Sequence, residues 1–247
     1  MAAGATFEGN LGVVQLQTDA NGNVTGGTLL GQISTGGAAI AGIAMSPDGS
    51  RVYVTTGVAG VNTAASGGSN PVLARTGCTN QTGGPDNNGL LTVVNVAAAE
   101  ANPGSGAIAA TVDAGCNPVR VVESTSESVQ WVTARGDNRV LAFSPSMLES
   151  DANNALLGYA DTGGTAPVGL ALFDDDQLLA VANSNRFSTG TANATILCVA
   201  NPSSASVVQT IATGIFPREI RAGADDATLY LTNSDSDSLQ VITTTVN

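Results

Sequence analysis

Residues 40–55, IAGIAMSPDGSRVYVT, carry a pattern that the chain repeats three more times. The later copies begin at Pro118, Pro167 and Pro217, and all four align without gaps. Apolar residues recur three and fourteen positions after each start, with the polar runs SPDG, TSES, DDDQ and ADDA between them. Two short apolar runs joined by a polar turn are typical of a β-hairpin. Each copy therefore predicts two antiparallel strands.

Two further strand-like runs follow the copies. Third runs are found at 91–96, 139–144, 195–200 and 238–243, and fourth runs at 107–114, 155–162 and 207–214. A four-stranded unit that recurs at roughly 50 residues indicates the blade of a β-propeller; a β-sandwich or β-solenoid is the alternative. We expect an all-β propeller of four-stranded antiparallel blades, about four full blade-equivalents plus partial blade strands at the termini. It forms one domain, 1–247, with a long loop insertion at 57–89.

The strand-like runs at both ends of the repeat pattern correspond to incomplete blades. Runs 11–16 and 27–34 look like the third and fourth strands of a blade without its first half, and run 238–243 is a third strand without a fourth. Three explanations remain open: a small ring with one surplus strand, part of a larger propeller, or open edges that pair between chains. The last would give a dimer or a filament.

The repeat also resembles a known family. SPDGSRVYVT (46–55) and LYLTN (229–233) resemble the YVTN-type propeller repeat, whose family includes lactonase-like propellers of bacteria and fungi. GCNPVR (115–120), WVTAR (131–135) and FPRE (216–219) are similar to positions in its secreted, lactonase-like branch. The resemblance, over about 9–243, implies a propeller. As an alternative function, the resemblance also implies hydrolysis of a sugar lactone or cyclic acid at the central channel.

Composition argues against several classes of partner and of catalytic site. The net charge of −12 argues against nucleic acid and anionic membranes as partners, since both attract basic surfaces. The chain contains no His, which removes Ser-His-Asp and Cys-His catalysis and His-based zinc or copper sites. We therefore expect no catalytic set, no metal and no cofactor. Residues 1–10 lack the basic and apolar regions of a signal peptide, and no run is long enough to span a membrane.

Candidate ligand-binding residues are expected on one face of the propeller. Strand order places the blade-joining loops and the loops between second and third strands on one face, here called the upper face. The candidates expected there are Arg120, Arg135, Arg218, Glu219 and Arg221, together with Glu123. Arg120 and Glu219 hold the same repeat position. They either project toward the axis and bind an anionic or polyhydroxyl ligand, or form an ion pair between blades.

The cysteines and sequons point to an oxidising, extracellular environment. Cys78 and Cys116 are expected on one face in adjacent blades, where a disulfide can join them. Cys198 is expected to be a buried free thiol. Sequons at Asn23, Asn80 and Asn193 all fall in expected loops and are candidates for N-glycosylation.

These observations favour a secreted, non-catalytic β-propeller that acts as a binding or structural and assembly module. Its partner would be a small molecule, a glycan or a protein, and self-association through open strand edges is a further expectation. The alternative is the lactonase-like hydrolase that the family resemblance implies.

Overall fold

The computed structural model describes residues 9–59, 78–79, 85–86, 88–186 and 191–244, which form antiparallel sheets. The described chain opens with a long hairpin of β1 (Asn10–Thr18) and β2 (Val24–Ser34). Three four-stranded blades and one three-stranded blade follow in chain order. A short pair, β5 (Cys78–Thr79) and β6 (Pro85–Asp86), lies inside the first blade's insertion.

The strands of each blade are consecutive in sequence, apart from β5 and β6. Blade 1 consists of β3 (Gly37–Met45), β4 (Arg51–Ala59), β7 (Leu90–Asn95) and β8 (Ile108–Asp113). Blade 2 consists of β9 (Pro118–Glu123), β10 (Gln130–Ala134), β11 (Arg139–Phe143) and β12 (Leu156–Asp161). Blade 3 consists of β13 (Pro167–Phe173), β14 (Leu178–Asn183), β15 (Asn193–Cys198) and β16 (Ser206–Ala212). Blade 4 consists of β17 (Pro217–Ala222), β18 (Thr228–Asn233) and β19 (Ser238–Thr243).

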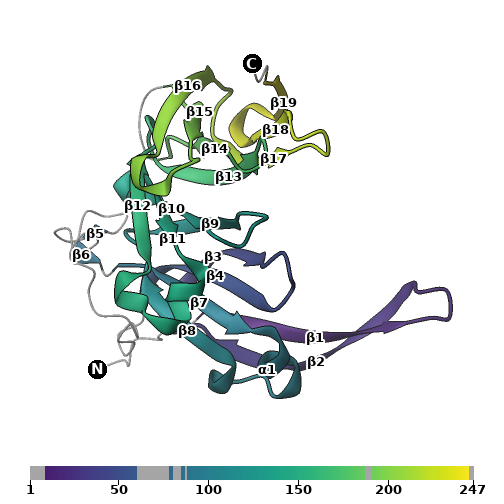
Figure 1. Ribbon diagram of the computed structural model, residues 1–247. Coiled ribbons are helices and arrows are strands. Elements are labelled where there is room, and N and C mark those ends of the chain that lie inside the picture. Colours follow the sequence, from purple (N-terminus) through teal and green to yellow (C-terminus); the bar gives the residue numbers. More distant parts are fainter. Residues whose placement is uncertain (1–8, 60–77, 80–84, 87, 187–190, 245–247) are drawn as a thin grey trace, which may run out of the picture.

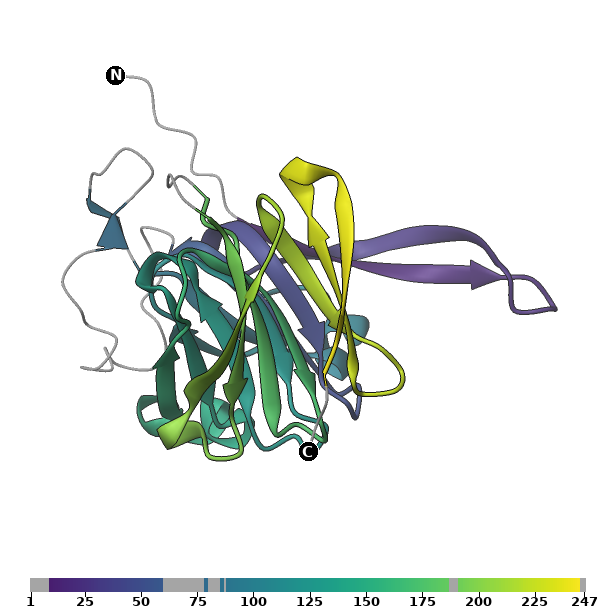
Figure 2. The ribbon, with the colours of Figure 1, turned by 90° about the horizontal axis from the view of Figure 1, so that it is seen from above.

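The blades stand side by side in an arc, with β3, β9, β13 and β17 innermost (Figure 1). The arc is open between blade 4 and the β1–β2 hairpin, which projects from the body in both views (Figures 1 and 2). The propeller expectation is confirmed, including the partial blades at the two ends. Among the described residues, two short α-helices lie between strands of the blades: α1 (Val96–Ala101), which was not expected from the sequence, and α2 (Pro145–Ser150).

Apolar clusters fill each junction between neighbouring blades. Tyr53 and Val93 of blade 1 pack with Val121 and Val132 of blade 2, and equivalent clusters join blades 2 to 3 and 3 to 4. A fourth cluster holds the base of the hairpin, where Ile33 packs against the outer strands of blade 1. Because aromatic residues make up only 4% of the chain, Val, Leu, Ile and Ala supply most of this burial.

The repeat fixes the backbone where each innermost strand begins. The residue before each copy of the repeat has a positive φ between 51° and 57°, although none of the four is glycine: Ala39, Asn117, Ala166 and Phe216. The pairing register of all four first strands then shifts within the next few residues. A non-glycine residue in the left-handed region costs free energy. This costly conformation recurs at the same repeat position in all four blades. The turn into each innermost strand is therefore a conserved part of the repeat within this chain, and it lies on the upper face.

The predicted Cys78–Cys116 disulfide is confirmed. Cys198 is free, as expected, but the prediction that it is buried is wrong. Both faces of β15 are buried over residues 194–197, and Cys198 is exposed because it is the last residue of the strand.

The sequons differ in their surroundings. Asn23 is exposed in the turn between β1 and β2 and remains a glycosylation candidate, whereas Asn80 lies outside the described residues. The expectation of a loop at Asn193 is wrong, because this residue begins β15. Its amide nitrogen donates to the Gly163 carbonyl (3.3 Å), and its amide oxygen accepts from Asn183 (2.8 Å).

Most of the 57–89 insertion also lies outside the described residues. Among the described residues, no helix has the length and apolar character needed to cross a membrane.

Candidate functional site

The upper end of the channel is a cavity of about 260 Å³ with four arginines in its wall: Arg120, Arg135, Arg186 and Arg218. The second residue of each copy of the repeat also lines it, and these are Ala41, Val119, Val168 and Arg218. The register shift at the start of each innermost strand therefore occurs at the channel wall. The cavity thus combines apolar strand ends with guanidinium groups.

The next repeat position holds Gly42, Arg120, Gly169 and Glu219 in blades 1 to 4. A Cβ on Gly42 would lie 2.3 Å from the Val119 carbonyl oxygen, and one on Gly169 would lie 2.9 Å from that of Arg218. Glycine at these two positions lets adjacent innermost strands come close together. The long side chains at the same repeat position in blades 2 and 4, Arg120 and Glu219, can then reach each other.

Arg120 donates from Nε to Glu219 Oε2 at 3.0 Å, from blade 2 to blade 4. Its Nη1 also donates to the Ala41 carbonyl of blade 1. Arg221 Nη2 contacts the other oxygen of Glu219 at 2.9 Å. Both oxygens of this carboxylate are therefore occupied, and the ion-pair reading of Arg120 and Glu219 is the one that the geometry supports.

Arg135 and Arg218 carry positive charge without a described partner. Arg135 follows β10 and is half-buried, and in the described part of the chain neither guanidinium has a hydrogen bond or ion pair. Desolvation lowers the pKa of Arg135, and the nearby positive charge of Arg186 lowers it further. Both residues line this cavity, so two positive charges face the same space.

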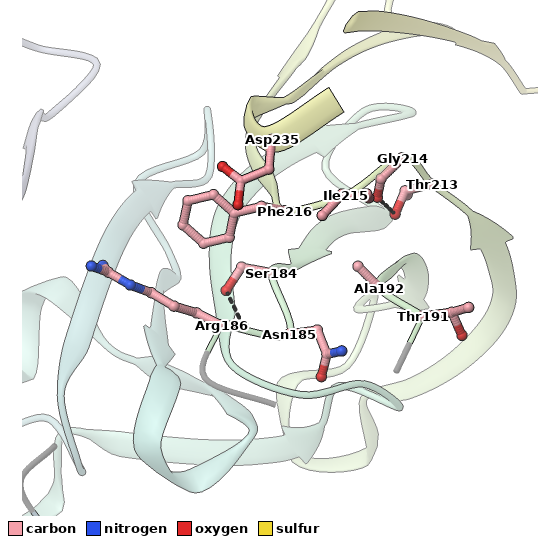
Figure 3. A pocket seen from close by; sticks show the side chains of 10 residues that line it. All are labelled: Ser184, Asn185, Arg186, Thr191, Ala192, Thr213, Gly214, Ile215, Phe216 and Asp235. Atoms are coloured by element: carbon pink, nitrogen blue, oxygen red, sulfur yellow. Dashed lines mark hydrogen bonds between the residues drawn. The ribbon is translucent and has the colours of Figure 1, made fainter. Parts of the chain in front are cut away.

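Arg186 joins this cavity to a second one of about 570 Å³. Its guanidinium lies 5.7 Å from the centre of the Phe216 ring, at the distance of a cation–π contact. In Figure 3, Arg186 points away from Thr191 and Thr213, which lie at the far end of this second cavity. Asp235, beside Phe216, is the carboxylate in its described lining.

A third cavity, of about 700 Å³, lies along the inner strands and the base of the hairpin; Arg120, Glu123, Glu219 and Arg221 are in its lining. The expectation that Glu123 lies on the upper face is wrong. It ends β9, at the hairpin-turn side of the sheet, because innermost strands run away from the upper face. Burial raises the pKa of Glu123 to about 7, the Tyr53 hydroxyl donates to it (3.2 Å) and lowers that pKa, and Glu127 and Asp48 raise it.

The structure thus gathers Arg120, Arg135 and Arg218 at one cavity and leaves Glu219 and Arg221 in an ion-pair cluster below it. Sequence reasoning missed Arg186, which follows β14 and has no counterpart in the aligned repeat. One signal was present, since Arg135 and Arg186 are each the first arginine after a second strand. Within the described ranges, no cluster of acidic or thiol side chains could hold a metal ion.

No protein-family model matches the sequence, and no curated protein matches it significantly. Solved structures do match. A functionally unknown protein from Desulfotomaculum acetoxidans is 16% identical with a TM-score of 0.59, over 98% of this chain and 70% of that one. Hydrazine synthase from Kuenenia stuttgartiensis is 14% identical with a TM-score of 0.58, over 87% and 48%.

The Cps50 (Swd1) β-propeller domain from Myceliophteria thermophila is also similar, at 12% identity and a TM-score of 0.52, over 83% of this chain and 54% of that domain. The chain spans about half the length of two of these three structures. At such low identity the likeness concerns fold alone. Together with the sheet order and the open arc, it shows that the chain has the β-propeller fold.

Proposed function

We propose that this chain is an extracellular, non-catalytic binding module that holds a small anion at the upper end of its channel. One observation carries the proposal: guanidiniums of Arg135, Arg186 and Arg218 line one small cavity, in a protein whose net charge is −12. Guanidinium groups match carboxylate and phosphate oxygens with paired hydrogen bonds. The disulfide supports the extracellular part, since such bonds persist in oxidising compartments.

The first prediction concerns Arg135. We expect phosphate or citrate to raise the melting temperature and to bind in calorimetry, whereas glucose does neither. Loss of one charged hydrogen-bond donor costs about 1.5–3 kcal/mol, so Arg135→Met should weaken anion binding by about 10- to 100-fold. Rising salt should weaken binding to the wild type as well, because these charges are partly exposed.

Arg51→Met is the matched control, because Arg51 pairs with Glu149 on the surface and lies outside the cavity. It should leave anion affinity unchanged. Equal affinity of Arg135→Met and wild type, or stabilisation by sodium chloride as strong as by phosphate at equal ionic strength, would contradict the proposal.

A hydrolase is the second candidate, and Glu123 is the observation that favours it. This carboxyl lines the 700 Å³ cavity with Arg120, and its pKa of about 7 suits a general base near neutral pH. A hydrolase would open a sugar lactone with a rate that rises through pH 7, as Glu123 ionises, and Glu123→Gln would abolish that rise. Absence of turnover above background in the wild type would dismiss this candidate.

A further inference from the structure

Each complete blade has two faces, and the repeat assigns different residues to each. We call the face turned toward the next blade in the chain the forward face, and the face turned toward the preceding blade the backward face. In the junction between blades 1 and 2, the forward face contributes Tyr53, Leu91 and Val93, and the backward face contributes Val121 and Val132. The same repeat positions meet in the next two junctions.

Among the described residues, no blade packs on the forward face of blade 4. Position for position, Tyr230 takes the place of Tyr53, Val241 that of Val93, and Leu239 that of Leu91. Their exposed fractions are 42%, 57% and 61%, whereas the nine equivalent residues of blades 1 to 3 are at most 2% exposed. These nine are Tyr53, Leu91, Val93, Trp131, Val140, Ala142, Ala180, Ala194 and Ile196.

The inner half of the backward face of blade 1 is open in the same way. Ile43 is 61% exposed, whereas its equivalents Val121, Leu170 and Ile220 are at most 7% exposed. Met45, two residues along the same face of β3, is also 61% exposed. The outer half of this face is covered, because Ile33 at the base of the hairpin packs there. What lacks cover is the place that the inner strands of a preceding blade would occupy.

The exposed Tyr230 of β18 and Ile43 of β3 hold repeat positions that meet in all three junctions within the chain. The open faces therefore match the inner half of a junction that the chain builds three times within itself. Neighbouring exposed apolar side chains, such as the cross-strand pair Tyr230 and Val241, favour an interaction site, and the repeat specifies the shape that fits it. We infer that a second copy of this chain docks head to tail, with the forward face of its blade 4 on the backward face of blade 1. A second copy carries both halves, so the contact can recur and close into a ring or extend. This inference is independent of the anion site.

Introduction of a charge on each face separately gives the test. Wild type should sediment at twice the monomer mass or more at high concentration. Ile43→Asp removes the backward face and Leu239→Asp the forward face. Each should weaken self-association about tenfold or more, because a charge would be buried without a partner. Both side chains are exposed, so circular dichroism and melting temperature should match those of the wild type.

The mixture of the two variants is the decisive measurement. Ile43→Asp keeps an intact forward face and Leu239→Asp an intact backward face, so mixing them should restore a species of twice the monomer mass. Val208→Asp, at an exposed apolar residue of outer strand β16, is the matched control and should associate like the wild type. A wild type that stays monomeric, an Ile43→Asp variant that associates normally, or a mixture that stays monomeric would overturn the inference.

Discussion

Glu123 shows at the scale of one residue how burial controls a charge. Tyr53 donates to one carboxylate oxygen, while the other is buried without a hydrogen-bond partner. The ionised form is therefore poorly solvated, and the folded-state pKa is raised from 4.5 to about 7. Folding then binds a proton between these two pH values, so the stabilisation is complete below pH 4.5 and is lost as pH rises through 7.

Glu123→Gln should remove this dependence on pH. We expect the variant to match the wild type in unfolding free energy near pH 4.5 and to exceed it by about 1–3 kcal/mol at pH 8. Glutamine keeps an oxygen that can accept from Tyr53 but never becomes charged. Urea unfolding of both proteins at the two pH values measures the difference, in which the other carboxylates cancel. A stability difference that is the same at both pH values would contradict this account.

Single residues also mark how far sequence reasoning reaches into the candidate site. Arg120, Arg135 and Arg218 could be found because they occupy or follow repeated strands whose ends meet at the channel. Arg186 was missed because it lies beyond the aligned repeat, and its one sequence signal is that it is the first arginine after a second strand. Glu123 was assigned to the wrong end of its strand, because a single strand can carry residues to both ends of the channel.

At the scale of elements, the close approach of innermost strands depends on glycine. Gly42→Ala would bring a Cβ to 2.3 Å from the Val119 carbonyl oxygen and 3.2 Å from Arg120 Cα, and backbone cannot turn aside as a side chain can. We expect a loss of about 1–3 kcal/mol in unfolding free energy from overpacking. Urea unfolding measures it.

Gly12→Ala is the control for this prediction. Gly12 also lies in a strand, but the nearest atom to an added Cβ is Leu29 Cδ1 at 3.6 Å, an ordinary contact. Its stability should therefore stay close to that of the wild type. If both variants lost the same unfolding free energy, the loss would come from replacing any glycine in a strand. It would then not show that the close approach of β3 and β9 requires glycine at position 42.

Strand positions were the most predictable elements. Hydrophobic period and turn residues located all four innermost hairpins, because each blade satisfies the same local rules. Helix α1 was missed: its run VAAAEA is too short to show helical periodicity, and Asn95 caps it by accepting from the Ala98 amide at 2.9 Å. The Cys78–Cys116 pairing was predictable because strand order alone places both residues on one face.

At the scale of the whole molecule, the turns opposite the upper face connect successive blades. The Asp48 amide donates to Glu127 (2.8 Å), the Thr125 amide to Asp176 (2.6 Å) and the Asp175 amide to Asp226 (2.7 Å). The three acceptors hold one repeat position, all with positive φ, and Gly49 holds that position in blade 1 with φ 74°. Whether the arc closes could not be predicted from the sequence. Each blade is specified by its own local pattern, whereas closure depends on the geometry of all the junctions between blades together.

Gly49→Asp would supply the acceptor that blade 1 lacks. A head-to-tail contact places the turn of blade 4, with Asp225 in the position of Asp48 and Asp175, against this residue. We expect self-association to tighten by about 2- to 10-fold, the effect of about 0.5–1.5 kcal/mol for one added hydrogen bond. Sedimentation equilibrium measures it. Gly49→Ala, which bears the same backbone strain without an acceptor, should not tighten association; equal tightening in both variants would mean that the turns do not meet across the contact.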